Sequence, residues 1–147
     1  MATGPKDVVR AFVDALNRQD WDRVGRMAAP DFSYTIMSYH LPGAGTPMDR
    51  ETMLKVLPGA FALFDETGPQ LEITRLVAED DWVVAEAQGS GFFRDGSPYT
   101  NRYANLYEVV GDRVRTIREY MDTQHMAHSF AVVGVVGRPG RPVPDGG

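Results

Sequence analysis

Two glutamates in strand-like stretches are the side chains of this sequence best suited to acid/base chemistry. A carboxylate inside an apolar pocket loses hydration, so its pKa rises toward neutrality and it can accept or donate a proton at working pH. Glu119 shares strand parity with Ile117, which should face the core, so we expect Glu119 to point inward as the main base, with Glu86 nearby. The alternative for Glu119 is an ion pair with Arg102 or Arg118 on the sheet surface.

Asp122 and the histidines widen the set of candidate acids and bases. Asp122 is either a second catalytic acid or the N-cap of a following helix. His40, in a loop rich in Pro and Gly, is either an acid or base at a pocket mouth or a solvated histidine. Asp122, His125 and His128 stand at i, i+3 and i+6, where helical side chains diverge by more than half a turn. We therefore expect no metal site. The sequence has no Gly-rich phosphate loop and no dinucleotide-binding fingerprint, so we expect no cofactor.

Tyr34 is a further catalytic candidate, because its hydroxyl could position a substrate oxygen or a water. The alternative is a core tyrosine with its hydroxyl at the edge. Glu86 and Gln88 share one side of a strand, which faces either a pocket or water. The residues expected to contact a substrate are Gln88, Tyr103, Asn105, Phe64 and Ile36.

Three predicted helices precede most of these residues in the chain. Apolar residues at the spacing i, i+3, i+4, i+7 predict the first helix over residues 5–17. Asp20 can cap a second helix, which Pro30 should stop. Asp49 can cap a third helix, although Pro58–Gly59 in its middle should kink or divide it.

Alternating apolar and polar residues predict the strands. A short strand covers residues 32–36, and four more follow the third helix. In the longest of these, the odd-numbered residues 99–109 share one face. Gly111–Asp112 then fits a type II′ hairpin turn, and the returning strand ends at Asp122.

The order of elements is helix, helix, strand, helix and then four antiparallel strands. This order predicts an α+β fold in which helices cover one face of a curved antiparallel sheet that wraps a pocket. We expect residues 1–130 to form a single domain, with a short helix at about residues 123–130. Residues 131–147 are so rich in Gly and Pro that we expect a mobile tail without chemistry.

Composition excludes several classes of function. The chain has 147 residues, of which 43% are hydrophobic and 24% charged, and it has no apolar stretch long enough to cross a bilayer. It has no cysteine, which removes disulfides and thiolate metal sites, and its N-terminus shows no signal peptide, so we expect a cytoplasmic protein. The net charge of −5 without a basic patch argues against binding to nucleic acid.

Residues 103–114, YANLYEVVGDRV, and residues 117–123, IREYMDT, together with the element order, resemble the SnoaL-like branch of the nuclear transport factor 2-like superfamily. The superfamily also contains ketosteroid isomerases, polyketide cyclases, scytalone dehydratase and limonene-epoxide hydrolase. The resemblance spans about residues 5–130. It implies a cystatin-like α+β barrel, with a cone-shaped sheet closed by the N-terminal helices around an apolar cavity, and a homodimer formed through the sheet.

Two acidic residues of this sequence stand where related enzymes of two different activities have acidic residues. Glu119 matches the place of the Asp that activates water in the epoxide hydrolases, and Asp122 resembles an acidic residue of the polyketide cyclases. Glu86 and Gln88 occupy the positions of an Arg and an Asp in the epoxide hydrolases, so the charge-alternating triad of those enzymes is broken here.

Tyr34 lies where the epoxide hydrolases supply a water-positioning Tyr and Asn, but Ile36 stands where the Asn would be. The tyrosine that ketosteroid isomerases keep in their first helix is absent, since that helix has Phe12. The resemblance therefore does not support a steroid isomerase mechanism.

The leading expectation is a cofactor-independent acid/base enzyme that acts on a hydrophobic, oxygenated small molecule, of the polyketide cyclase, dehydratase or isomerase type, with Glu119 as base. The second is epoxide opening by an activated water, with Glu119 as base, Glu86 as acid and Tyr34 holding the water. The third is a non-catalytic ligand-binding or dimerisation module, because this fold does not imply catalysis.

Overall fold

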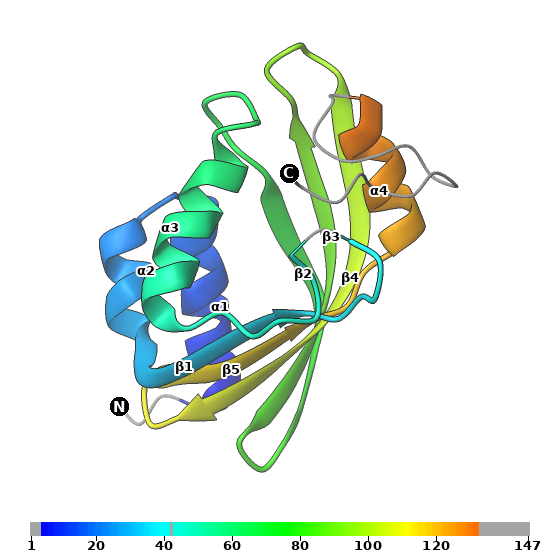
Figure 1. Cartoon of the computed structure of the whole chain (residues 1–147). Coiled ribbons are helices and arrows are strands. Elements are labelled where there is room, and N and C mark those ends of the chain that lie inside the picture. Colours follow the sequence, from blue (N-terminus) through cyan, green and yellow to red (C-terminus); the bar gives the residue numbers. More distant parts are fainter. Residues whose placement is uncertain (1–3, 42, 133–147) are drawn as a thin grey trace.

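The structure is a computed structural model that describes residues 4–41 and 43–132. These residues form four helices and five strands (Figure 1). In chain order the elements are α1 (Pro5–Asn17), α2 (Trp21–Met27), β1 (Ala28–Ile36), α3 (Arg50–Phe61), β2 (Gln70–Glu79), β3 (Trp82–Phe92), β4 (Pro98–Val110), β5 (Arg113–Glu119) and α4 (Thr123–Val132).

The five strands make one bent sheet in the order β1-β5-β4-β3-β2, with the helices α1, α2 and α3 on one face (Figure 1). The predicted α+β class with helices on one face of a curved sheet is confirmed. Two details differ from the prediction. β1 pairs with β5 in parallel, so the sheet is mixed, and β1 and β2 remain separate edges, so the sheet is not closed into a barrel.

The helix predictions rest on apolar spacing and caps that the structure reproduces. α1 buries Val9, Phe12 and Val13 against the sheet, as the apolar spacing predicts. The carboxylate of Asp20 accepts a hydrogen bond from the Arg23 amide at 3.0 Å and so caps α2. The Asp49 carboxylate caps α3 in the same way, through the amide of Thr52 at 2.8 Å.

α2 ends before Pro30, as predicted, whereas Pro58 does not divide α3. α2 ends at Met27, and Pro30, which was expected to stop it, lies inside β1. β1 tolerates a proline because it is an edge strand and its pairing with β5 is interrupted between Ala28 and Ser33. α3 continues through Pro58 to Phe61 as one helix rather than two.

The hairpin of β4 and β5 is confirmed. Gly111 has a φ of +62°, whereas Asp112 is not among the residues with positive φ, as a type II′ turn requires. Val110 pairs directly with Arg113 across this two-residue turn. The odd-numbered residues of β4 from Tyr99 to Val109 face the helices and are buried or half-buried.

α4 packs at the other end of the same face, against an aromatic cluster. The rings of Phe64 and Phe93 stack with centroids 4.6 Å apart, and Tyr99 and Phe130 meet them edge-on or tilted. Met126 of α4 packs beside this cluster. The cluster therefore joins α4 to the end of β4.

None of the helices in the described part of the chain combines the length and the apolar character that a membrane crossing needs. The expected tail begins at residue 131, but residues 131 and 132 belong to α4. The remainder of that prediction, residues 133–147, lies outside the described residues.

Candidate active site

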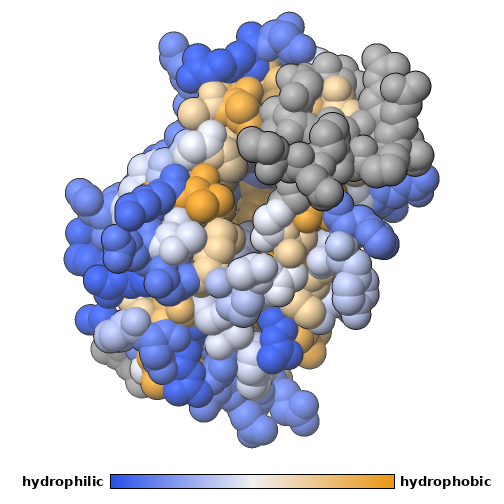
Figure 2. All heavy atoms as spheres, in the orientation of Figure 1, coloured by the Kyte–Doolittle hydropathy of each residue, from blue (hydrophilic) through white to orange (hydrophobic). Residues whose placement is uncertain are grey.

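A cavity of about 510 Å³ lies between the helices and the inner face of the sheet. Its wall is mostly apolar, with Leu57 and Phe61 from α3 and Met126 and Phe130 from α4. Figure 2 shows apolar residues gathered near the middle of this side of the molecule, between polar flanks. The polar residues of the wall are Asn17, Tyr34, Gln70, Tyr99, Tyr103, Asn105, Tyr107 and Glu119.

Glu119 and Tyr34 meet in this cavity across the parallel strands β1 and β5. The register pairs Tyr34 with Ile117 and Ile36 with Glu119, so all four side chains lie on the inner face. The Tyr34 hydroxyl donates a hydrogen bond to Oε2 of Glu119. The parallel pairing that sequence patterns did not predict is thus what brings these two residues together.

Burial raises the pKa of Glu119 from 4.5 to about 7. Glu119 is half-buried, and it lines the cavity with its neighbours. Among the described residues, no Lys, Arg or His lines the cavity, so no positive charge there offsets the loss of hydration. The Tyr34 hydroxyl donates to this carboxyl, and a hydrogen bond of that kind favours the carboxylate form. A carboxyl with this pKa can take or give a proton near neutral pH.

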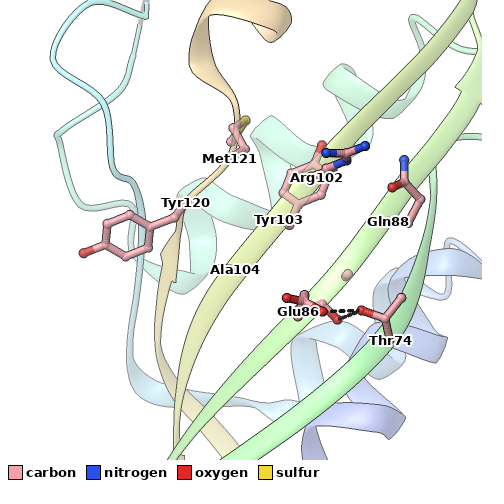
Figure 3. A pocket seen from close by; sticks show the side chains of 9 residues that line it. Thr74, Glu86, Gln88, Arg102, Tyr103, Ala104, Tyr120 and Met121 are labelled. Carbon is pink, nitrogen blue, oxygen red and sulfur yellow. Dashed lines mark hydrogen bonds between the residues drawn. The ribbon is translucent and has the colours of Figure 1, made fainter.

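The alternative of a surface ion pair for Glu119 is not what the structure shows. Arg118 lies on the outer face, with its guanidinium carbon 5.3 Å from the centre of the Trp82 ring. Arg102 lies beside Gln88 on that same face (Figure 3). It does not line the cavity that holds Glu119.

Six of the ten predicted site residues line the cavity. They are Tyr34, Ile36, Phe64, Tyr103, Asn105 and Glu119. They come from β1, β4, β5 and the segment after α3, which the fold brings together. Asn105 also accepts a hydrogen bond from the Tyr120 amide at 3.2 Å, which fixes its side chain beside β5.

Glu86 and Gln88 lie elsewhere, on the outer face of the sheet (Figure 3). The hydroxyl of Thr74 on β2 donates to the Glu86 carboxylate at 3.1 Å. The expectation that Glu86 shares a cavity with Glu119 is therefore wrong, because the inner face of β3 is taken by small residues. Ala85 and Ala87 hold those inner positions, where helices pack close to the strand.

Asp122 and His40 also lie outside the cavity wall. The Asp122 carboxylate accepts a hydrogen bond from the His125 amide at 2.9 Å, so it caps α4. His40 is exposed in the loop after β1. Within residues 4–41 and 43–132, no three Asp, Glu or His side chains are arranged to hold a metal ion.

Sequence reasoning missed several residues of the cavity wall. Tyr99 was available from strand parity, because it shares the inner face of β4 with Tyr103. Met126 and Phe130 give no comparable signal, since their role depends on where α4 docks. Burial raises the pKa of Tyr107 to about 12, so its hydroxyl stays protonated in the wall.

A family model described as the SnoaL-like domain matches residues 9–117, and the chain therefore belongs to the SnoaL-like family. The resemblance drawn from residues 103–114 and 117–123 is thereby confirmed. A comparison with curated protein sequences found no significant match.

Solved structures share the fold at low sequence identity. IdmH from Streptomyces antibioticus, a proposed polyketide cyclase, is 21% identical, with a TM-score of 0.72 over 88% of this chain and 99% of that one. An LEH-like epoxide hydrolase from M. tuberculosis is 20% identical, with a TM-score of 0.67 over 81% and 83%. A protein with a ketosteroid isomerase-like fold from Catenulispora acidiphila, solved with trimethylamine, is 20% identical, with a TM-score of 0.69 over 82% and 89%.

Proposed function

We propose that this protein catalyses proton transfer on a hydrophobic, oxygenated small molecule without a cofactor, with Glu119 as the base. The observation that carries the proposal is a carboxyl with a pKa of about 7 in the wall of an apolar cavity of about 510 Å³. The similarity of the fold to a proposed polyketide cyclase supports this class of reaction.

The reaction follows from the groups in the wall. The Glu119 carboxylate takes a proton from a carbon next to a carbonyl, the C–H bond breaks, and its electron pair moves into an enolate. The neutral Glu119 carboxyl then returns the proton to the enolate, either at the same carbon or at another. Tyr34 holds the carboxyl through its hydrogen bond to Oε2, which limits the orientations that Glu119 can adopt.

Exchange of carbon-bound hydrogen tests the proposal without knowledge of the natural substrate. The probe is α-tetralone, an apolar aromatic ketone with acidic hydrogens beside its carbonyl, incubated with the protein in D₂O and followed by NMR. We expect exchange whose rate rises with pH and levels off above about pH 7, as Glu119 becomes ionised. Replacement Glu119→Gln should slow it by roughly 10²- to 10⁴-fold, the usual contribution of a general base.

Glu86→Gln is the matched control, because it makes the same change on the outer face and should leave the rate unaltered. Binding of the ketone with no exchange above background in either the natural protein or Glu119→Gln would instead support a non-catalytic binding module.

Epoxide opening is the second candidate, because the Tyr34 hydroxyl that donates to Glu119 still has a lone pair that can accept a hydrogen bond from a water beside the carboxyl. The fold similarity to an epoxide hydrolase is consistent with it. The step also needs an acid for the epoxide oxygen, and among the described residues Glu119 is the only carboxylic acid in the cavity wall. Styrene oxide in H₂¹⁸O should give a labelled diol if this candidate holds.

A further inference from the structure

Two tyrosine hydroxyls face each other in the cavity wall, and Glu119 is not part of this pair. The Tyr99 and Tyr103 oxygens lie 2.7 Å apart, a short hydrogen bond between neutral groups. Both residues sit on the inner face of β4 and line the cavity. Burial raises the pKa of each hydroxyl, so both are protonated at neutral pH and can act as hydrogen-bond donors.

Asn101 fixes one end of this pair. Its Oδ1 accepts a hydrogen bond from the Arg102 amide at 2.8 Å, so its Nδ2 points the other way. Nδ2 donates to the backbone oxygen of Asp122 and to the Tyr99 hydroxyl, both at 3.2 Å. Asn101 is buried, with 3% of its surface exposed, so these contacts hold its orientation.

The direction of the hydrogen bond between the tyrosines follows from the need to satisfy the buried Tyr99 proton. Among the hydrogen bonds of the described residues, the Tyr103 oxygen is the only acceptor available to the Tyr99 hydroxyl. Tyr99 is almost fully buried, so a proton without an acceptor there would be costly. Donation from Tyr99 to Tyr103 satisfies this buried proton, and in that arrangement the Tyr103 proton is left to bond a molecule in the cavity.

The Tyr103 ring packs against Gly89 on β3, which has no side chain to exclude it. A Cβ at position 89 would lie 2.6 Å from Cε2 of Tyr103, closer than carbon atoms can approach. The ring thus lies directly over the glycine backbone, on the neighbouring strand. This contact holds Tyr103 against the sheet and restricts where its hydroxyl can point.

We propose that Asn101, Tyr99 and Tyr103 form a directed chain of hydrogen-bond donors that binds the carbonyl or enolate oxygen of the ligand. The inference rests on the proposed function, since it supplies the group that stabilises the negative oxygen formed when Glu119 removes a proton. Each bond in such a chain polarises the next, so Tyr103 is a stronger donor than an isolated tyrosine. Tyr103 contacts the ligand, whereas Tyr99 and Asn101 are positioning residues.

The register of β4 and β5 places this donor at a usable distance from the base. Tyr103 pairs with Met121 and Leu106 with Arg118, and the same register sets Asn105 opposite Glu119. Tyr103 and Asn105 are two residues apart, or about 7 Å along the strand. A ketone held by Tyr103 can therefore present its neighbouring carbon toward Glu119.

The infrared carbonyl band of ¹³C=O-labelled α-tetralone bound to the protein tests this chain. We expect the band at lower frequency than in hexane, because a strong donor lengthens the carbonyl bond. In Tyr103→Phe, which keeps the ring over Gly89, the band should move most of the way to the hexane value, and affinity should fall about 5-fold. In Tyr99→Phe it should move part of the way. Tyr120→Phe, a hydroxyl lost from the outer face, should leave it unchanged.

An identical band in the natural protein and Tyr103→Phe would overturn the proposal, as would no effect of Tyr99→Phe or no binding of the ketone. Deuterium exchange in the same samples keeps the two proposals apart. A shifted band without exchange would support the donor chain and contradict the proposed catalysis. Exchange with an unshifted band would support the catalysis and contradict the donor chain. If the ketone does not bind, a pH titration of the Glu119 carboxyl still tests whether this residue has the pKa of the proposed base.

Discussion

The two faces of the sheet shift the pKa of a glutamate carboxyl in opposite directions. Glu119 on the inner face has a raised pKa, because burial removes water from its carboxyl and no cation replaces it. Glu108 on the outer face has a lowered pKa, because it accepts hydrogen bonds from Arg115 and from Thr116. The surroundings of the carboxyl, and not the residue type, therefore make Glu119 the candidate base.

Glu86 sharpens the same contrast. It lies in a strand, as Glu119 does, and its neighbours in the sequence, Ala85 and Ala87, are apolar. Its side chain nevertheless sits in an open groove beside Thr74 and Gln88 (Figure 3). Successive side chains of a strand point to opposite faces of the sheet. A shift of one residue along the strand therefore decides whether a carboxyl faces the cavity or the outside.

The outer face is where we expect the largest effect, through association of two chains. Val77, Val84, Phe92 and Tyr120 are exposed large side chains of β2, β3 and the end of β5, and we propose that a second copy covers them. A dimer with micromolar affinity corresponds to about 8 kcal/mol of binding free energy. Sedimentation at concentrations well above the micromolar range should therefore give about twice the monomer mass of 16.3 kDa.

Val84→Lys is the variant that tests where the dimer forms. It places a charge in the middle of the outer face and should shift the protein to monomer while Glu119 keeps its titration. A clean monomer of the natural protein across this concentration range would remove the proposed assembly.

The next largest effect is on stability at the inner face. Because the pKa of Glu119 is higher in the folded than in the unfolded chain, its contribution to stability falls as pH rises from about 4.5 to 7 and stays low above 7. Glu119→Gln should therefore raise the free energy of unfolding at pH 8 by up to about 3 kcal/mol. The gain should vanish near pH 4, which urea unfolding at both pH values would measure.

Replacement of Glu108 on the outer face should give the smallest effect, a change in stability of the opposite sign. The lowered pKa of Glu108 stabilises the fold at neutral pH, and this stabilisation is lost as pH falls through the folded-state pKa. Glu108→Gln should therefore destabilise at pH 7 by less than about 1 kcal/mol, because the pair is partly exposed. The same pH trend in both variants would contradict the contrast between the faces.

Much of the inner face could be predicted from the sequence. The period of two over residues 99–109 gives the inward set of β4, and Gly111–Asp112 gives the hairpin that lays β5 beside it. The parity of Ile117 then gives the inward position of Glu119. These inferences succeed because they depend on local geometry that a few residues determine.

Other features depend on contacts between distant segments and could not be predicted in this way. Alternation predicts that residues 32–36 form a strand but not that β1 pairs in parallel with β5, which sets Tyr34 beside Glu119. The face of Glu86 was left open for a related reason. Its strand has small residues on one side and polar ones on the other, and only the docking of α1 shows which side is covered.

The titration of Glu119 itself is the most direct test of a buried base in the cavity. Carboxyl ¹³C chemical shifts of the natural protein, assigned by comparison with Glu119→Gln, would be followed from pH 3 to pH 9. We expect a midpoint of about 7 for Glu119. A midpoint near 4.5, the ordinary value for a glutamate, would contradict the buried base and with it the proposed acid/base function.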